Sequence, residues 1–121
     1  MMTGNVLHKH AMLPVLFRLP GQPDITIEFV VDTGFTGALA LPLSAIAALA
    51  LPYIGEQAAN LANDTEVEIS LHSATIVWND TEQEVRVLAT GSRPLLGTTL
   101  LDGNELLVQF VDRGLVTVDL L

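Results

Sequence analysis

Hydrophobic residues occur along this chain in short runs, many of them alternating with polar residues, and such runs are typical of β-strands. The segments between the runs are rich in Gly, Pro, Asn and Asp, which favour turns. The pattern predicts strands at 13–20, 25–31, 38–41, 66–78, 94–96, 106–110 and 115–120, with residues 1–12 as an N-terminal edge strand or tail.

One segment has a different composition. Pro42 is followed by "LSAIAALAL", and Ala and Leu favour a helix, while proline suits the first helical turn. Pro52 ends the segment. We therefore expect an all-β fold with one short helix, formed by residues 1–121 as a single domain.

A short repeated sequence predicts two hairpin turns. "NDTEVEISL" begins at Asn63 and "NDTEQEVRVL" begins at Asn79, and a β-type run follows each Asn-Asp-Thr. Asn and Asp tolerate the left-handed backbone of tight turns and bond to their own main chain. The long strand at 66–78 should connect the two tips.

Composition excludes several classes of function. The chain has no cysteine, so disulfides and thiolate chemistry are excluded. Its net charge of −9 would repel phosphate backbones and anionic membrane surfaces, so we expect neither nucleic acid nor membrane as a partner. The N-terminus lacks the pattern of a signal peptide, and Pro42 and Pro52 interrupt the most apolar stretch. We expect a cytoplasmic protein.

The sequence contains few other motifs typical of catalysis or of metal binding. Neither phosphate-binding glycine motif is present, and no G-x-S-x-G marks a serine nucleophile. His8 and His10 in "HKH" could hold a metal in principle, but no carboxylate lies close in sequence, and solvated side chains are the simpler interpretation. We expect no metal and no cofactor.

The stretch "FVVDTGFTGALAL" (29–41) contains the most informative residue. Asp32 follows three apolar residues directly, and a carboxylate at the edge of a core is costly unless it is paired or solvated. One interpretation is that Asp32 only caps the turn that "TGFTG" forms, as Asp does in many β proteins. The other is that the carboxylate has a chemical role.

The second interpretation is strengthened by "RPLLGTTLL", which follows about sixty residues after Asp32. An apolar strand, D-T-G, a second Gly and a downstream L-L-G resemble the retroviral-like aspartic proteases, and the small prokaryotic members with a D-T-G-F loop in particular. The resemblance extends from about Leu13 to the end of the chain. It implies a closed β-barrel, the half-domain of the acid proteases, in which Asp32, Thr33 and Gly34 form the catalytic loop and Phe35 borders the substrate.

In that family a hairpin called the flap folds over the substrate. The resemblance implies a flap within Glu56 to Trp78, with substrate-binding residues near its tip at Leu61, Ala62, Asn63 and Asp64. Only one D-T-G is present, so the resemblance also implies a homodimer in which Asp32 of each copy meets its mate on the two-fold axis. The paired carboxylates would activate water for hydrolysis of a peptide or protein substrate.

This sequence departs from the viral pattern at several positions. Viral enzymes carry an acid four residues after the catalytic Asp and an Arg after the second-motif Gly, whereas this chain has Thr36 and Thr98. The flap tip carries Asn63 and Asp64 where viral flaps are rich in glycine. The alternative function is therefore a peptide-binding or dimerisation module that keeps the fold without proteolysis, for instance by adding a peptide strand to its sheet.

Overall fold

The structure is a computed structural model that describes residues 1–60 and 63–121. These residues are mostly strand, which confirms the all-β class. Within them the elements are β1 (Met2–Leu7), β2 (His10–Arg18), β3 (Ile25–Val31), β4 (Leu39–Leu41), α1 (Leu43–Leu49), β5 (Tyr53–Asn60), β6 (Glu66–Trp78), β7 (Thr81–Ala89), β8 (Leu95–Leu96), α2 (Thr98–Leu101), β9 (Asn104–Val108) and β10 (Leu115–Leu120).

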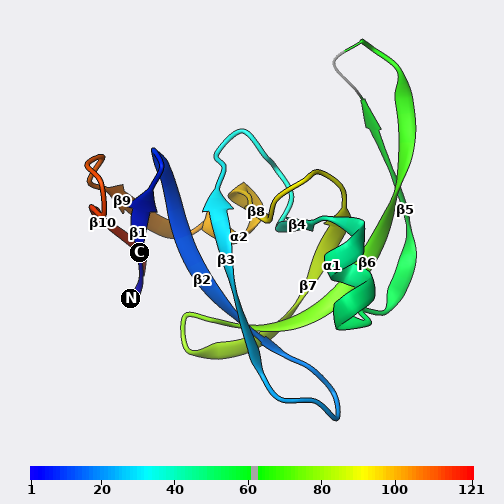
Figure 1. Cartoon of the computed structure of the whole chain (residues 1–121), viewed down its shortest axis with the longest axis horizontal. Helices are drawn as coiled ribbons and strands as arrows, with labels where there is room; N and C mark the ends of the chain where they lie inside the picture. The colour runs from blue at the N-terminus through cyan, green and yellow to red at the C-terminus, as the bar shows by residue number, and fades with distance from the viewer. Residues whose placement is uncertain (61–62) are drawn as a thin grey trace.

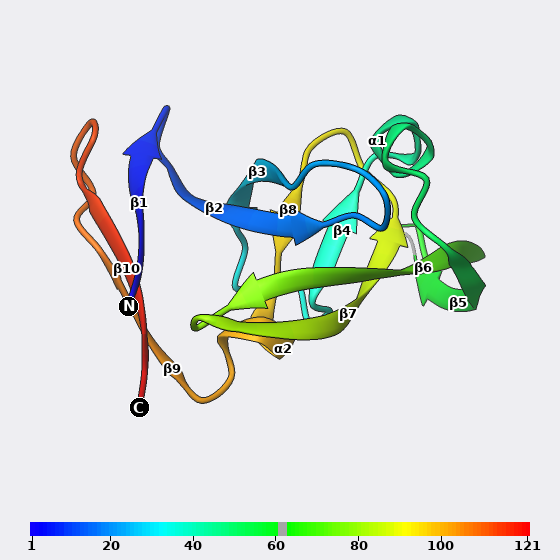
Figure 2. The same cartoon turned by 90° about the horizontal axis from the view of Figure 1, so that it is seen from below.

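The strands form one sheet that turns back on itself (Figures 1 and 2). Their order is β5-β6-β7-β4-β8-β3-β2-β1-β10-β9, and β6 also pairs with β2. The second pairing joins β2, β3, β8, β4, β7 and β6 into a ring. β1, β10 and β9 continue outward from β2, and β5 continues outward from β6, so two extensions project from the ring.

The main core lies inside the ring and follows from the alternating pattern of the strands. In β2 the buried residues are every second one, from Ala11 through Val15 to Phe17. The rings of Phe17 and Phe29 stack with centroids 5.9 Å apart. Each such apolar side chain contributes roughly 1.5–3 kcal/mol when fully buried, so the ring is held together chiefly by its interior.

The predicted strands and turns are largely confirmed. β3 and β6 have the predicted bounds, 25–31 and 66–78. β2 begins three residues before, and ends two residues before, the predicted strand at 13–20. The two Asn-Asp turns connect β5 to β6 and β6 to β7. Asp64, Asn79 and Asp80 have φ of 62°, 51° and 62°, the left-handed backbone that these residue types tolerate.

Two expectations need correction. The expected count of one helix was too low, because the helical turn that the sequence "TTLLDG" allows is formed as α2. There the amides of Leu100 and Leu101 both donate to the carbonyl of Gly97, and that of Asp102 donates to Thr98. The N-terminal segment is neither an edge strand nor a tail, since β1 pairs with β2 on one side and β10 on the other. The β9–β10 hairpin returns to cover it, which no local pattern in residues 1–12 could indicate.

In the described part of the chain, no helix has the length and apolar character needed to cross a bilayer.

Candidate active site

Asp32 lies immediately after β3, at the start of the loop that leads to β4. Its backbone amide donates to the carbonyl of Leu96 (2.9 Å), which continues the pairing of β3 with β8. The amide of Gly34 donates to its Oδ1 (2.9 Å), and the amide of Phe35 donates to its carbonyl (3.1 Å). These bonds form a tight Asx-type turn, and they hold the half-buried carboxylate in one orientation at the surface.

The loop after Asp32 rests on the start of α2. The amide of Gly97 donates to the carbonyl of Ala38 (2.9 Å), and that of Thr98 donates to Phe35 (2.8 Å). The hydroxyl of Thr99 donates to the carbonyl of Thr36 (2.6 Å). Thus the segments "DTGFTG" and "LLGTT", far apart in sequence, form one unit in which each positions the other.

These hydrogen bonds lie where the viral pattern has an acid and an arginine, which this chain lacks. At the corresponding positions, Thr36 and Thr98 take part in hydrogen bonds between the loop and α2 rather than in an ion pair. A neutral hydrogen bond contributes about 1 kcal/mol, and the several bonds here act together. The loop is therefore held without the charged pair.

Replacing Thr99 with valine removes the hydroxyl that holds Thr36 while keeping the side-chain shape. Because the bond joins the loop to α2, we expect the free energy of unfolding to fall by about 1 kcal/mol and the loop to loosen. Urea denaturation measures the first effect, and amide hydrogen exchange at residues 33–37 measures the second. Thr98→Val, whose hydroxyl lies 3.4 Å from the Phe35 carbonyl, is the matched control and should have a smaller effect. Equal effects from both would contradict this assignment.

A surface hollow of about 440 Å³ opens at Asp32. Its other lining residues are His10, Val30, Val31, Thr33, Arg93 and Leu95. Nη1 of Arg93 lies 3.0 Å from Nε2 of His10. Arginine can only donate, so a hydrogen bond between the two side chains needs this ring nitrogen of His10 as the acceptor.

From the sequence, His10 was interpreted only as a possible metal ligand or a solvated residue, and Arg93 in "RPLLGTTLL" was given no role. His10 lies beside Asp32 because β2 runs antiparallel to β3, with Met12 opposite Val30, so the start of β2 reaches the end of β3. Arg93 lies there because it comes just before β8, in which Leu95 pairs with Val30 of β3. Predicting this placement would have required the strand register, since Arg93 is 61 positions from Asp32 (93 − 32) in the sequence.

The β5–β6 hairpin projects from the ring on the same side as the loop after β3 (Figure 1). This is the hairpin expected to act as a flap. Asn63 and Asp64 are exposed in its turn, where the side chain of Asn63 accepts a bond from the amide of Thr65 (3.1 Å). The other two residues expected at the tip, Leu61 and Ala62, lie outside the described residues.

The base of this hairpin is anchored by a small polar cluster. The hydroxyl of Tyr53 donates to Oε1 of Glu56 (2.9 Å), and this bond to a carboxylate raises the pKa of Tyr53 above its ordinary value. The rings of Tyr53 and His72 pack in a T-shaped arrangement with centroids 5.7 Å apart. Nδ1 of His72 lies 3.1 Å from the carbonyl oxygen of Leu51. His72 is buried, and its partners are structural.

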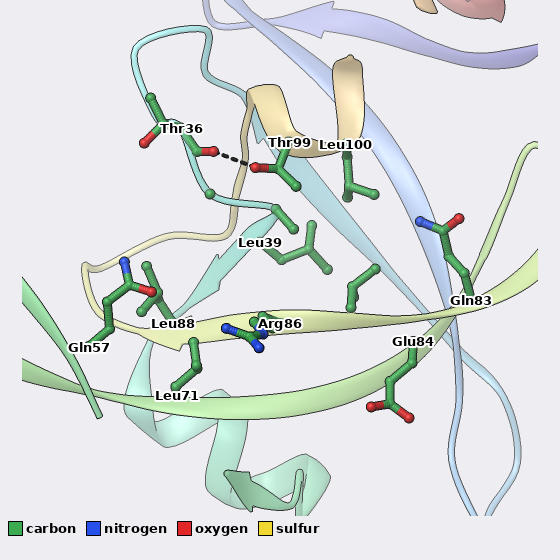
Figure 3. Close-up of a pocket in the computed structure, with 13 residues that line it drawn as sticks. Thr36, Leu39, Gln57, Leu71, Gln83, Glu84, Arg86, Leu88, Thr99 and Leu100 are labelled. Atoms are coloured by element: carbon green, nitrogen blue, oxygen red, sulfur yellow. Dashed lines mark hydrogen bonds between the residues drawn. The ribbon is translucent and has the colours of Figure 1, made fainter. Parts of the chain in front are cut away.

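A second cavity, also of about 440 Å³, lies between the loop after Asp32, the hairpin and β7 (Figure 3). Thr36 and Thr99 border one side of it, and Gln57 of β5 and Arg86 of β7 border the other. Its apolar lining includes Leu39, Leu71, Leu88 and Leu100. The cavity therefore offers apolar surface and hydrogen-bonding groups close to the candidate catalytic loop.

Phe35, which the resemblance places beside the substrate, packs against apolar residues of the sheet. Its side chain is half buried and lies against the cluster of Ala40, Leu71 and Leu88, beneath the loop. Its ring also approaches Gly37, where an added Cβ would lie 2.6 Å from Cζ. Leu71 and Leu88 also line the cavity of Figure 3, and the expected contact of Phe35 with substrate stays a prediction.

Comparison of the chain with protein-family models, with curated proteins and with solved structures gives no match.

Proposed function

We propose that the chain is a homodimeric aspartic endopeptidase of the retroviral-like type, with the ring of strands as its barrel. One observation carries the proposal: the D-T-G loop presents the Asp32 carboxylate at the surface while the L-L-G segment backs the loop through the Leu96, Gly97 and Thr98 amides and carbonyls. A turn residue alone would not need this second segment. The β5–β6 hairpin extends on the same side and provides a candidate flap.

The proposed chemistry needs two carboxyl groups and a water molecule. One carboxylate removes a proton from water, which attacks the peptide carbonyl, and the other carboxyl donates a proton to the carbonyl oxygen. Two carboxyl groups in contact share one proton because both cannot ionise cheaply, so base and acid arise from the same residue type. Neither a covalent intermediate nor a metal takes part in this route.

The second carboxyl group must come from a second copy. Among the described residues that line the Asp32 hollow, none besides Asp32 carries a carboxyl group. The other six are His10, Arg93, Thr33, Val30, Val31 and Leu95. A two-fold dimer places equivalent residues opposite each other, so Asp32 would meet Asp32 of the mate. The site would then form only on association, and activity would depend on protein concentration.

A bound peptide would lie between the catalytic loop and the hairpin. The cavity beside Thr36, Gln57 and Arg86 would receive a substrate side chain, with leucines forming its apolar floor. β5 is an edge strand, so its outer backbone groups are available to an extended peptide.

The test is a cleavage assay on a diverse peptide mixture, read by mass spectrometry over a range of pH. We expect internal peptide bonds to be cleaved, inhibition by a statine-type transition-state mimic, and a specific activity that rises with enzyme concentration as dimers form. Chelators should have no effect. Absence of cleavage at enzyme concentrations where the protein is dimeric would contradict the proposal.

The alternative is a peptide-binding module without proteolysis. The observation in its favour is the Asx-type turn, because the bond from Gly34 to Oδ1 gives Asp32 a sufficient structural role. Such a module would bind the statine-type peptide and an ordinary peptide of the same sequence about equally, whereas a protease binds the mimic at least about 100-fold more tightly. Isothermal titration of both peptides separates the two functions.

A further inference from the structure

We infer that the turn between β9 and β10, together with the turn between β1 and β2, is the surface on which the second copy docks. This inference rests on the proposed function, because it asks how two Asp32 loops are brought together. The residues concerned, named here the turn patch, are Val6, His8, Lys9, Phe110, Val111 and Asp112.

Large apolar side chains are exposed in the turn patch. Phe110 is 70% exposed and Val111 is 66% exposed. Together with His8 and Lys9 they border a hollow of about 610 Å³, into which a side chain from another molecule could insert. Exposed adjacent apolar residues around a hollow are typical of protein–protein contacts.

The backbone holds these residues in place. The amide of Val6 donates to the carbonyl of Gly114 (2.8 Å), and the amide of Arg113 donates back to Val6 (2.8 Å). Gly114 also leaves no space for a side chain, since an added Cβ would lie 1.9 Å from the carbonyl oxygen of Gln109. The turn is therefore fixed against β1, and little conformational entropy would be lost when a partner binds.

The turn patch and the Asp32 hollow adjoin each other along the chain. His8 and Lys9 belong to the turn patch, and the next residue, His10, borders the hollow that contains Asp32. In Figure 1 both turns extend on the same side of the molecule as the loop after β3, at the end away from the β5–β6 hairpin. A copy that docks here brings its own Asp32 loop toward this one and leaves the flap side open for a peptide.

Charge favours a second copy as the occupant. With a net charge of −9, two copies repel each other over most of their surfaces. Lys9 borders the turn patch and Arg93 borders the adjoining hollow, so two of the chain's five Lys and Arg residues lie at this face. Because the patch also contains Asp112, a two-fold arrangement lets Lys9 of each copy face Asp112 of the other.

The test is analytical ultracentrifugation of the full chain and of the double variant Phe110→Asp/Val111→Asp. Four new carboxylates per dimer, in apolar surroundings, should weaken dimerisation by roughly 100-fold. The matched control is Leu43→Asp on α1, which is 64% exposed and lies on the far side of the ring, and it should dimerise like the wild type. Circular dichroism verifies that each variant is folded.

A second pair of variants tests for two-fold docking. Lys9→Asp and Asp112→Lys should each weaken dimerisation when alone, and an equimolar mixture should dimerise, because each mixed contact then joins opposite charges. A double variant Phe110→Asp/Val111→Asp that dimerises like the wild type, or a wild type that stays monomeric, would overturn the inference. The peptide cleavage assay reports separately on the proposed function.

Discussion

Replacing Asp32 with asparagine should lower the rate of peptide hydrolysis by roughly 1,000-fold or more, because general acid–base catalysis at this level requires a group that exchanges protons. The change is conservative for the loop. The amide oxygen of asparagine can still accept the bond that Gly34 donates to Oδ1. The free energy of unfolding should therefore change little, and the measurement is the ratio of kcat/KM between variant and wild type at equal dimer concentration.

Two controls make this result specific. Asp80→Asn removes an exposed acid from the other Asn-Asp turn, between β6 and β7 and outside the proposed site, and should leave the activity unchanged. Mixing wild type with an excess of Asp32→Asn should lower the activity further than dilution does, since mixed dimers carry only one carboxyl group at the axis. If Asp32→Asn retains wild-type hydrolysis, then the Asp32 carboxylate serves the turn alone.

Replacing Gly97 with alanine should destabilise the fold by about 3 kcal/mol and lower the melting temperature by roughly 10 °C. The physical reason is contact with backbone atoms. An added Cβ would lie 2.3 Å from the carbonyl oxygen of Gly37 and 2.5 Å from that of Phe35, and neither can move without breaking the bonds between the loop and α2. Because this loop carries Asp32, activity should fall together with stability.

Gly21→Ala is the matched control for this variant. Gly21 has a φ of +69°, and nothing lies within 4 Å of an added Cβ, so alanine there meets only the cost of left-handed backbone, about 1–2 kcal/mol. It should leave activity unchanged under folding conditions. A Gly97→Ala variant as stable as Gly21→Ala would mean that the loop and α2 can separate. Differential scanning calorimetry of both variants decides this.

Local sequence patterns were sufficient for most of the strands and turns. Alternation in β3 and β6 predicted their bounds, because one face of each strand must be apolar to reach the interior of the ring. The two Asn-Asp-Thr segments predicted hairpin turns, because these residue types accept the left-handed backbone that the turns adopt. Both signals depend only on a residue and its near neighbours.

The candidate site could be predicted only in part. The pattern of strand, D-T-G and L-L-G identified Asp32, and the structure brings the two segments into hydrogen-bonding contact. The structure also places His10 and Arg93 beside Asp32 and packs Phe35 against the cluster of Ala40, Leu71 and Leu88, and no sequence pattern predicted these contacts. Side-chain orientation at the end of a strand depends on what packs against it.

The sequence by itself determined the all-β class, the long hairpin and the residue that most needs an explanation, since each follows from local preference. Only the tertiary structure decided that β1 lies between β2 and β10, that Thr98 and Thr99 support the loop, and that the β9–β10 turn lies next to the β1–β2 turn. Some of these features join segments more than a hundred residues apart, such as Met2 and Val118, and strand register rather than composition sets which of them meet.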